Sequence, residues 1–318
     1  MISLNRMRNL SKHIFFIGFI VIHYGCRSPL ELELPDSKAL VAIEGFINPT
    51  DKFYVYVNPI NPIGKLNPIE NLEDTKVNIF VGQKLYNLEK VATNGEDGIV
   101  FSHPEATWPE NENYTLTIQV EGQEPISAHT SIPKKNVNIN EFNISDVQRN
   151  SGTFQSVKVN LDWIASDAKF GYYHVLFYKV NYIIGIDGVP VPDPSKDREY
   201  LTIDEAYSPQ TKELITLSHE PGVLIDARKV DGLSSINLTG YCKTQNVIYN
   251  NKESFKEIQV ELRAVTEEYY KYQRSLFIQM KGSRGGINEA DPSIGYTNMK
   301  NATGIFGGYV KIYDFKSF

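Results

Sequence analysis

Short alternating segments separated by turn residues are the feature of this sequence that most restricts its fold. Each segment is rich in β-branched or aromatic residues, and Gly, Pro, Asn and Asp lie between them. At the roughly 8–12-residue spacing typical of sandwiches, they predict an immunoglobulin-like β-sandwich over residues 40–135. Tyr114 is expected to pack at a corner of this sandwich and to bond backbone there. The segments are LVAIEGFI, FYVYVNPI, KVNIFVG, KLYNLEKV, GIVFSH, NYTLTIQVEG and ISAHTSIP.

A second antiparallel β domain is predicted over residues 136–318, because the roughly 290 residues that follow the leader exceed the usual size of one core. The boundary is placed in the linker IPKKNVNINEF, near residue 135. VKVNLDWIAS and GYYHVLFYKVNYIIGI are long and alternating, so we expect them to pair as neighbours in one sheet. INLTGYCKT, FKEIQVELRAVT and the end of the chain predict further strands. Alternation places Tyr172, His174, Leu176 and Tyr178 on one face and Tyr173, Val175, Phe177 and Lys179 on the other, without showing which face meets solvent.

One helix is predicted, over residues 266–281. Thr266 can cap it, and Glu267 and Glu268 lie in its first turn. An apolar stripe recurs at three- and four-residue steps, which favours packing on a sheet over a partner site. The stripe consists of Tyr269, Tyr272, Leu276 and Met280.

The first 25 residues have the three parts of an export signal. Arg6, Arg8 and Lys12 precede the apolar run IFFIGFIVI, and Gly25 stands directly before Cys26. The run is about half the ~20 residues that a spanning helix needs. A small residue before a cysteine resembles a bacterial lipobox, although His23 and Tyr24 depart from its usual residues. The sequence predicts lipidation of Cys26, with an ordinary signal peptide or a short buried helix as the alternatives.

Residues 26–39 follow as a polar tether with two prolines. Three acids in this tether, which form a looser match to a surface-export signal, are Glu31, Glu33 and Asp36.

Charge and cysteine content exclude several classes of protein. The formal charge is −6, and removal of three basic residues with the leader changes it to −9. An acidic chain argues against nucleic-acid binding, which needs a basic surface. Cys242 is the only cysteine besides Cys26. With Cys26 lipidated no internal disulfide can form, and Cys242 is expected to be a buried small hydrophobe.

Residues 187–214 form a polar, proline-rich segment that predicts a long loop. Loops of this length are functional or disordered. Asp187, Asp193 and Asp197 gather there, which leaves calcium open, although their spacing matches no EF-hand and favours a solvated loop. No paired histidine or cysteine motif for a transition metal occurs, so neither a metal nor a cofactor is expected.

Catalysis is the weaker reading of this sequence. There is no G-x-S-x-G motif, and the glycine-rich tail contains no phosphate-binding string. His129 and His174 occupy strand positions, where cross-strand partners are commoner than general bases. The remaining histidines outside the leader are His103 and His219.

Aromatic side chains are the best candidates for ligand contact, since the chain has 19 tyrosines and their rings suit sugars and peptides. Most of them must pack on strand faces. If the long loop and the glycine-rich tail converge, the contacts are expected from Tyr200, Tyr207, Tyr296 and Phe306.

Several strings together resemble one known family. They are the start CRSPLELELP, the strand LVAIEGFI, the strings SAHTSIP and LRAVTEEYYKYQRSL, and the tail YTNMKNATGIFGGYVKIYD. These resemble the Bacteroidetes lipoprotein family known as domain of unknown function 4249, in which Asn-Ile precedes Gly-x-Gly-Ile-Phe-Gly. Asn298-Met299 and the residues through Gly307 keep most of this pattern, with Ala302 at its first glycine.

The resemblance spans almost the whole mature chain and implies an outer-membrane lipoprotein found beside TonB-dependent transporters. No catalytic or ligand residues of the family exist to carry over. We therefore expect a lipid-anchored accessory or binding protein of the outer membrane, without assigning it to the periplasmic or the cell-surface side. The alternatives are a structural or adhesive surface subunit and, less favoured, an envelope hydrolase.

Overall fold

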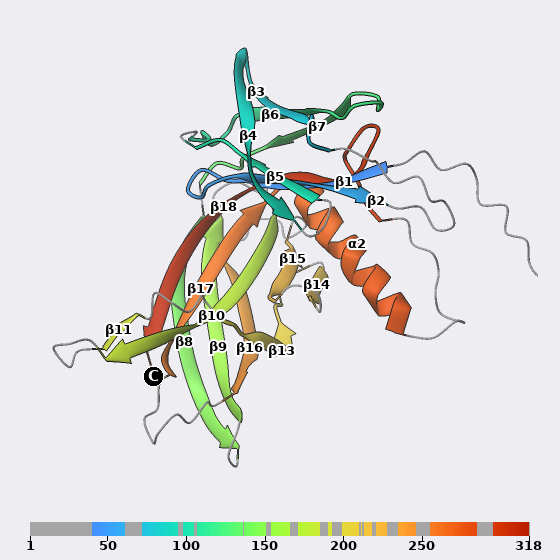
Figure 1. Ribbon diagram of the computed structural model, residues 1–318. Helices are drawn as coiled ribbons and strands as arrows, with labels where there is room; N and C mark the ends of the chain where they lie inside the picture. The colour runs from blue at the N-terminus through green and yellow to red at the C-terminus, as the bar shows by residue number, and fades with distance from the viewer. Residues whose placement is uncertain are drawn as a thin grey trace, which may run out of the picture. The chain divides into compact units, whose positions relative to one another are not determined.

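A computed structural model shows a mainly β chain (Figure 1). Contacts group it into two units, 1–38 and 39–318, and the described residues all belong to the second. Within them the single helix is α2, so the predicted fold class is confirmed. The leader, Cys26 and the tether lie outside the described residues. These residues are 40–60, 72–94, 98–104, 107–135, 137–150, 154–165, 171–184, 190–192, 199–209, 211, 213–217, 221–227, 235–245, 255–284 and 295–317.

The first seven strands match the seven predicted segments and form two facing sheets. β4 belongs to both sheets, because Lys84–Leu88 pairs with β3 and Glu89–Asn94 pairs with β5. Strand switching of this kind closes the side of a sandwich. The strands are β1 (Leu40–Ile47), β2 (Tyr54–Ile60), β3 (Lys76–Val81), β4 (Lys84–Asn94), β5 (Gly98–Ser102), β6 (Asn113–Gln119) and β7 (Ile126–Ser131).

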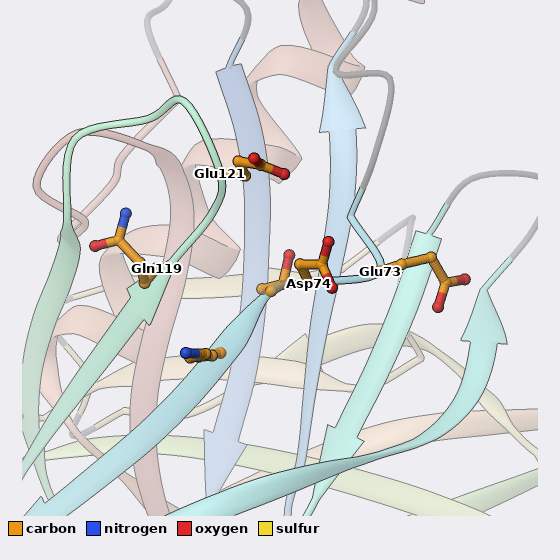
Figure 2. A pocket seen from close by; sticks show the side chains of 6 residues that line it. Glu73, Asp74, Gln119 and Glu121 are labelled. Carbon is orange, nitrogen blue, oxygen red and sulfur yellow. The ribbon is translucent and has the colours of Figure 1, made fainter.

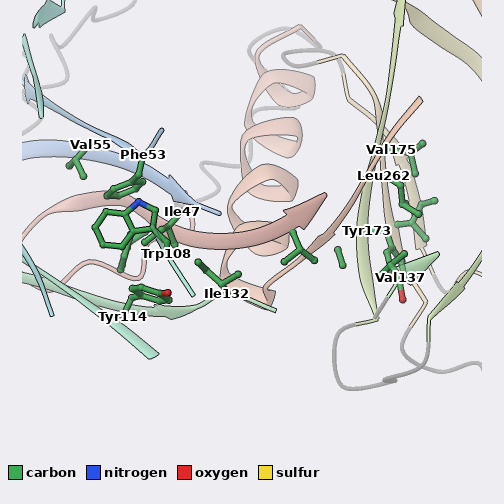
Figure 3. Close-up of a cluster of buried hydrophobic side chains, with 14 of the residues drawn as sticks. Ile47, Phe53, Val55, Trp108, Tyr114, Ile132, Val137, Tyr173, Val175 and Leu262 are labelled. Carbon is green, nitrogen blue, oxygen red and sulfur yellow. The ribbon is translucent and has the colours of Figure 1, made fainter. Parts of the chain in front are cut away.

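Aromatic side chains fill the space between these two sheets. Trp108 is 2% exposed and lies between Phe53 and Tyr114, at ring-centroid distances of 5.7 and 6.1 Å (Figure 3). The Tyr114 hydroxyl donates a hydrogen bond to the carbonyl oxygen of Pro109. The core role and backbone bond predicted for Tyr114 are therefore confirmed.

Two more sheets face each other in the rest of the chain. One has the order β13-β16-β9-β8, and the other includes β14-β15-β10-β17-β18, with β11 and β12 paired to β10. The bounds are β8 (Val137–Asn150), β9 (Phe154–Ala165), β10 (Tyr172–Ile184), β11 (Pro190–Pro192), β12 (Glu199–Tyr200), β13 (Thr202–Tyr207), β14 (Glu213–Thr216), β15 (Val223–Asp226), β16 (Ile236–Gln245), β17 (Phe255–Val265) and β18 (Thr303–Ser317).

The expectation that β9 and β10 pair in one sheet is wrong. They belong to opposite sheets and meet face to face, with Trp163 and Tyr173 at a ring-centroid distance of 5.4 Å. Alternation shows which residues share a face of a strand, and it does not show which strand lies beside it.

Two segments predicted as irregular contain strands. β8 begins in the segment interpreted as a linker, and its polar residues lie at the edge of a sheet. β11, β12 and β13 lie within the predicted loop 187–214, so that prediction is wrong for the described part of it. Asp187, Asp193 and Asp197 lie outside the described residues, as does His219. The domain boundary near residue 135 stays a prediction.

β18 joins the strands on the two sides of that boundary. Its residues 303–308 pair in parallel with β1, and residues 309–317 pair antiparallel with β17 (Figure 1). Gly308 allows the close approach, since a Cβ there would overlap the carbonyl oxygen of Ser131. Gly304 has a φ of +112°, a conformation that favours glycine.

Asn298 fixes the start of β18. Its side-chain amide accepts a hydrogen bond from the backbone N–H of Phe306 at 3.0 Å and donates one to the carbonyl oxygen of Phe306 at 2.8 Å. It also donates to the carbonyl oxygen of His129 in β7, at 3.2 Å. One side chain thus joins β7 to β18, which gives a structural reason for the asparagine of the tail motif.

α2 (Glu267–Arg284) packs against β18, and also against β10 and β15, and its bounds are close to the predicted ones. Its most buried residues are Tyr269, Tyr270 and Gln273, whereas Leu276 and Met280 of the predicted stripe are half-buried. The predicted sheet-packing role is confirmed for Tyr269. Residues 171–179 of the chain are buried on both faces, because one face meets the opposite sheet and the other meets α2.

Candidate functional site: a cleft beside α2

A cleft of about 230 Å³ lies between α2, the strands β1 and β2, and the segment 295–304. We name it the α2 cleft. Its floor is a row across three strands, in which Ala42 of β1 lies between Asn58 of β2 and Thr303 of β18. The same face of β1 continues with Glu44 and Phe46. Ala42 adds only a methyl group to this floor, whereas Glu44 and Phe46 have larger side chains.

The helix supplies one wall of the α2 cleft. Tyr272, Ser275, Leu276 and Gln279 all line it, and their three- and four-residue spacing places them on one side of α2. All four are half-buried. Gln279 lies against Gly295, where a Cβ would come within 2.9 Å of the Gln279 side-chain nitrogen.

Tyr296 forms the facing wall and is held to the helix. Its backbone N–H donates to the Ser275 hydroxyl oxygen at 3.0 Å, and that hydroxyl donates to the carbonyl oxygen of Tyr272 at 2.8 Å. The Lys271 ammonium lies 5.7 Å from the centroid of the Tyr296 ring. The wall is therefore positioned by several contacts to α2.

Charges of both signs surround the α2 cleft. Burial raises the pKa of Tyr296, and the carboxylates of Glu268 and Glu267 raise it further. Burial likewise raises the pKa of Tyr56, which lies opposite Glu44 in the strand pairing, and Glu44 adds to that rise. Lys271 forms an ion pair with Glu267 at 3.0 Å, and Glu44 is the one charged residue among those that line the cleft.

A second hollow, of about 390 Å³, lies at the other side of the first turns of α2. Its Glu213 carboxylate accepts two hydrogen bonds from Arg274, at 2.8 and 3.0 Å, and one from the Tyr270 hydroxyl at 2.6 Å. The hydrogen bond from Arg274 is the main cause of the lowered pKa of Glu213. These groups are already hydrogen-bonded to one another, so the hollow fits a structural role.

The third hollow, of about 630 Å³, is open and acidic. Figure 2 shows the carboxylates of Glu73, Asp74 and Glu121 apart from one another rather than converging on a point. Glu73 is bound to the ammonium of Lys90, at 2.6 Å. No group of three or more His, Cys, Asp or Glu is placed to hold a metal ion in the part of the chain that the structure describes.

The four predicted ligand residues lie in different surroundings. Tyr296 lines the α2 cleft. Tyr200 is 47% exposed and stacks on Tyr178 at 4.6 Å, and Tyr207 is 64% exposed at the end of β13. Phe306 is fully buried and packs on Phe53 at 6.0 Å, so it belongs to the core. The structure does not gather these residues into one site.

The candidate reactive groups are engaged in packing and hydrogen bonds. His129 bonds the cross-strand Thr115 at 2.9 Å, as predicted, and His103 packs on the ring of Tyr86. His174 shares a bond of 2.8 Å with the Tyr269 hydroxyl of α2. Cys242 is 1% exposed and burial raises the pKa of its thiol, which confirms that it is a buried hydrophobe.

Sequence reasoning missed most residues of the α2 cleft. Of its lining only Tyr296 was a predicted ligand residue. The available signal was in LVAIEGFI, where Ala42 and Glu44 interrupt a strand whose other face is wholly apolar. That pattern alone cannot identify which helix stands over the strand.

The model of the family described as Domain of unknown function (DUF4249) matches residues 27–311. The chain belongs to this family. The match confirms the resemblance drawn from the sequence, and it takes in every residue that lines the α2 cleft.

Comparison with other proteins adds no assigned activity. No curated relative matches the chain. The solved structures similar to it include the one titled Crystal structure of Dpr2 Ig1-Ig2 in complex with DIP-Theta Ig1-Ig3. That match has 10% identity and a TM-score of 0.24, and covers 70% of this chain and 92% of the other. At that TM-score it adds nothing to the fold described above.

Proposed function

We propose that this member of the DUF4249 family is a cell-envelope lipoprotein, anchored through Cys26, that acts by binding as an accessory of a TonB-dependent outer-membrane transporter. The observation that carries the proposal is the extent of the family match, which begins at residue 27, directly after Cys26. The leader and the cysteine thus precede the part that the family shares. This arrangement fits a leader that is removed and a cysteine that becomes the first residue.

A binding role is supported by the kind of hollow that the fold provides. The α2 cleft contains amide, hydroxyl and carboxylate groups beside apolar side chains, which is the composition of a recognition site. His174 and Cys242, by contrast, are buried in structural contacts. Among the described residues, no helix has the length and apolar composition to cross a membrane. The proposed attachment is through acyl chains on Cys26.

Labelling with palmitate in the native cell tests the anchor. The chain and its Cys242→Ala variant are expected to carry the label and to remain with the membrane fraction. Cys26→Ala is expected to lose both, because Cys26 is the only acceptor proposed. An unlabelled wild-type chain would refute the proposal.

Co-purification tests the partner. The tagged chain, solubilised from outer membranes in a mild detergent, is expected to bring a TonB-dependent transporter with it. Recovery of the chain alone at every salt concentration would exclude the transporter role.

A further inference from the structure

We propose that His174 is an acid-sensitive contact, which holds the first turns of α2 on the sheet while its imidazole is neutral and releases them when the imidazole is protonated. The inference goes beyond the proposed function, since it requires neither the anchor nor the transporter. It follows from the enclosure of the ring, from the direction of its hydrogen bond, and from the charge beside it.

The imidazole of His174 is enclosed between β10, α2 and the chain before β15. The residue is 0% exposed. Tyr269 of α2 packs on it at a ring-centroid distance of 5.9 Å. At the ring nitrogen Nε2 the backbone of Gly222 comes so close that an added Cβ would lie 2.8 Å away. Burial of this kind disfavours the charged form of a histidine, because the charge is removed from water.

The hydrogen bond of His174 fits a neutral ring. Its Nδ1 lies 2.8 Å from the Tyr269 hydroxyl oxygen, which also accepts a hydrogen bond from Nη1 of Arg263 at 3.1 Å. Because an arginine can only donate, the hydroxyl accepts from it and can give its own hydrogen to Nδ1. Protonation places a hydrogen on both ring nitrogens. The hydroxyl hydrogen then loses this acceptor, and with it a contact between α2 and β10.

A positive charge already lies beside the ring. Arg263 of β17 is directly opposite His174 in the strand pairing, and its side chain is only 16% exposed. Glu261 pairs with this guanidinium at 2.6 Å and so balances its charge. An imidazolium would therefore place a second positive charge beside one carboxylate. Like charges directly opposite each other on paired strands are destabilising.

The other acids around His174 have different neighbours. Glu267 of α2 pairs with Lys271 at 3.0 Å. Asp226 of β15 lies opposite Tyr172 in the strand pairing. The surroundings therefore favour the neutral ring. The ionisable side chains on the elements packed around it are Glu261 and Arg263 of β17, Tyr269 and Glu267 of α2, Tyr309 and Lys311 of β18, Tyr172 and Tyr178 of β10, and Asp226 of β15.

Hydrogen exchange of the lipidated chain in detergent, corrected for the intrinsic effect of pH on exchange, tests the inference. A free histidine takes up its proton near pH ~6.5. Below that value the opening constant of residues 269–273 is expected to rise by up to about tenfold per pH unit, the limit for uptake of one proton on opening. Peptides of β3 and β6 in the first sandwich are expected to change by less than about twofold. An equal response of both regions, or none at α2, overturns the inference.

Two histidine variants identify the group that takes up the proton. His174→Asn places an amide oxygen close to the position of Nδ1 and cannot titrate, so the acid response of α2 is expected to disappear. His129→Asn is the matched control, because His129 is exposed on β7 and bonds Thr115 across the strands. The control is expected to keep the wild-type response. A response that persists in His174→Asn, or one that is lost in His129→Asn, overturns the inference.

Nitrogen NMR of the wild-type histidine rings keeps the test decisive if His174→Asn does not fold. Substitution of the other histidines one at a time assigns the His174 signals. At neutral pH this ring is expected to be uncharged, with its hydrogen on Nε2. In acid its imidazolium signal is expected to appear only in step with faster exchange at residues 269–273. An imidazolium signal at His174 while α2 remains protected from exchange would refute the proposed release.

Discussion

The two halves of α2 meet the β-sheets in opposite ways. Over the first turns, Thr266, Tyr269, Tyr270 and Gln273 are each 4% exposed or less. From Ser275 onward the residues that face β1 and β2 are half-buried, and the α2 cleft lies beneath them. One helix therefore combines a tightly packed end with an end that leaves space.

A polar network lies under the packed end. The Tyr269 hydroxyl shares a hydrogen bond with His174 and accepts one from Arg263 at 3.1 Å. Arg263 also pairs with Glu261 at 2.6 Å, and Glu261 accepts from the Tyr178 hydroxyl at 3.3 Å. Buried polar groups stabilise a fold only when each has a partner. This network joins the first turns of α2 to β10 and β17.

Glu261→Ala is expected to have the largest effect, because it removes the buried carboxylate that pairs with Arg263, whose side chain is only 16% exposed. Removal of one partner of a buried ion pair costs about 3–5 kcal/mol of unfolding free energy. Urea unfolding measures the loss, and Glu89→Ala on an exposed part of β4 serves as the control. A loss no larger than that of the control would show that the network does not stabilise the packed end.

Tyr269→Phe is expected to come next, at about 1–3 kcal/mol, because it deletes a hydroxyl with two buried partners and keeps the ring. The ring still packs on Phe46 at 4.7 Å. The same unfolding measurement applies. An unchanged midpoint would mean that His174 and Arg263 find other partners at no cost.

Glu213→Gln tests a more exposed contact of the packed end and is expected to cost less than about 1 kcal/mol. The folded pKa of Glu213 lies below its ordinary value of 4.5. The carboxylate therefore stabilises the fold above that value, and the contribution is lost as pH falls through the lowered folded pKa. The difference between wild type and variant should be present at neutral pH and vanish in stronger acid. Arg274→Gln should behave alike, and a difference that persists in acid would contradict the pairing.

Leu276→Trp is expected to have the smallest effect on stability, close to that of Ile278→Trp at an exposed position of the same helix, because the added ring enters space that already exists. Core sites without such space lose about 1–3 kcal/mol on overpacking. Thermal unfolding of the two variants side by side makes the comparison. A large loss in Leu276→Trp alone would show that the open end of α2 is as tightly packed as the other.

The strands of the first sandwich could be predicted because each alternates and ends at a turn residue. β8 could not be predicted. Its polar residues after Pro133 resemble a linker, and the sequence does not show that the segment lies at the edge of a sheet. The sequence also could not predict that β9 and β10 lie in opposite sheets, or that β1 pairs in parallel with β18. Periodicity assigns a residue to a face, while the partner of a strand depends on contacts far away in the sequence.

The candidate site was predicted less well than the fold, for a related reason. The α2 cleft depends on where the helix stands over Ala42. That position depends on the close approach of Gly307 to Tyr269 of α2, where an added Cβ would come within 3.3 Å, and on the attachment of Tyr296 to Ser275. The sequence shows these residues and does not show that they meet. Phe306 shows the opposite kind of error. It was predicted to contact a ligand, but it is a fully buried core residue.

The shared strand β18 has a consequence for the order in which the chain matures. Ala42 of β1 pairs with Thr303 of β18. One edge of β1 therefore has no partner until residues more than 250 positions later in the chain have been synthesised. Contacts of such separation close slowly, and an unpaired edge can meanwhile join another chain. The sheet that contains β1 therefore remains incomplete until β18 has been synthesised. A chaperone that protects unpaired strand edges would be needed longest at the edge of β1 that β18 later covers.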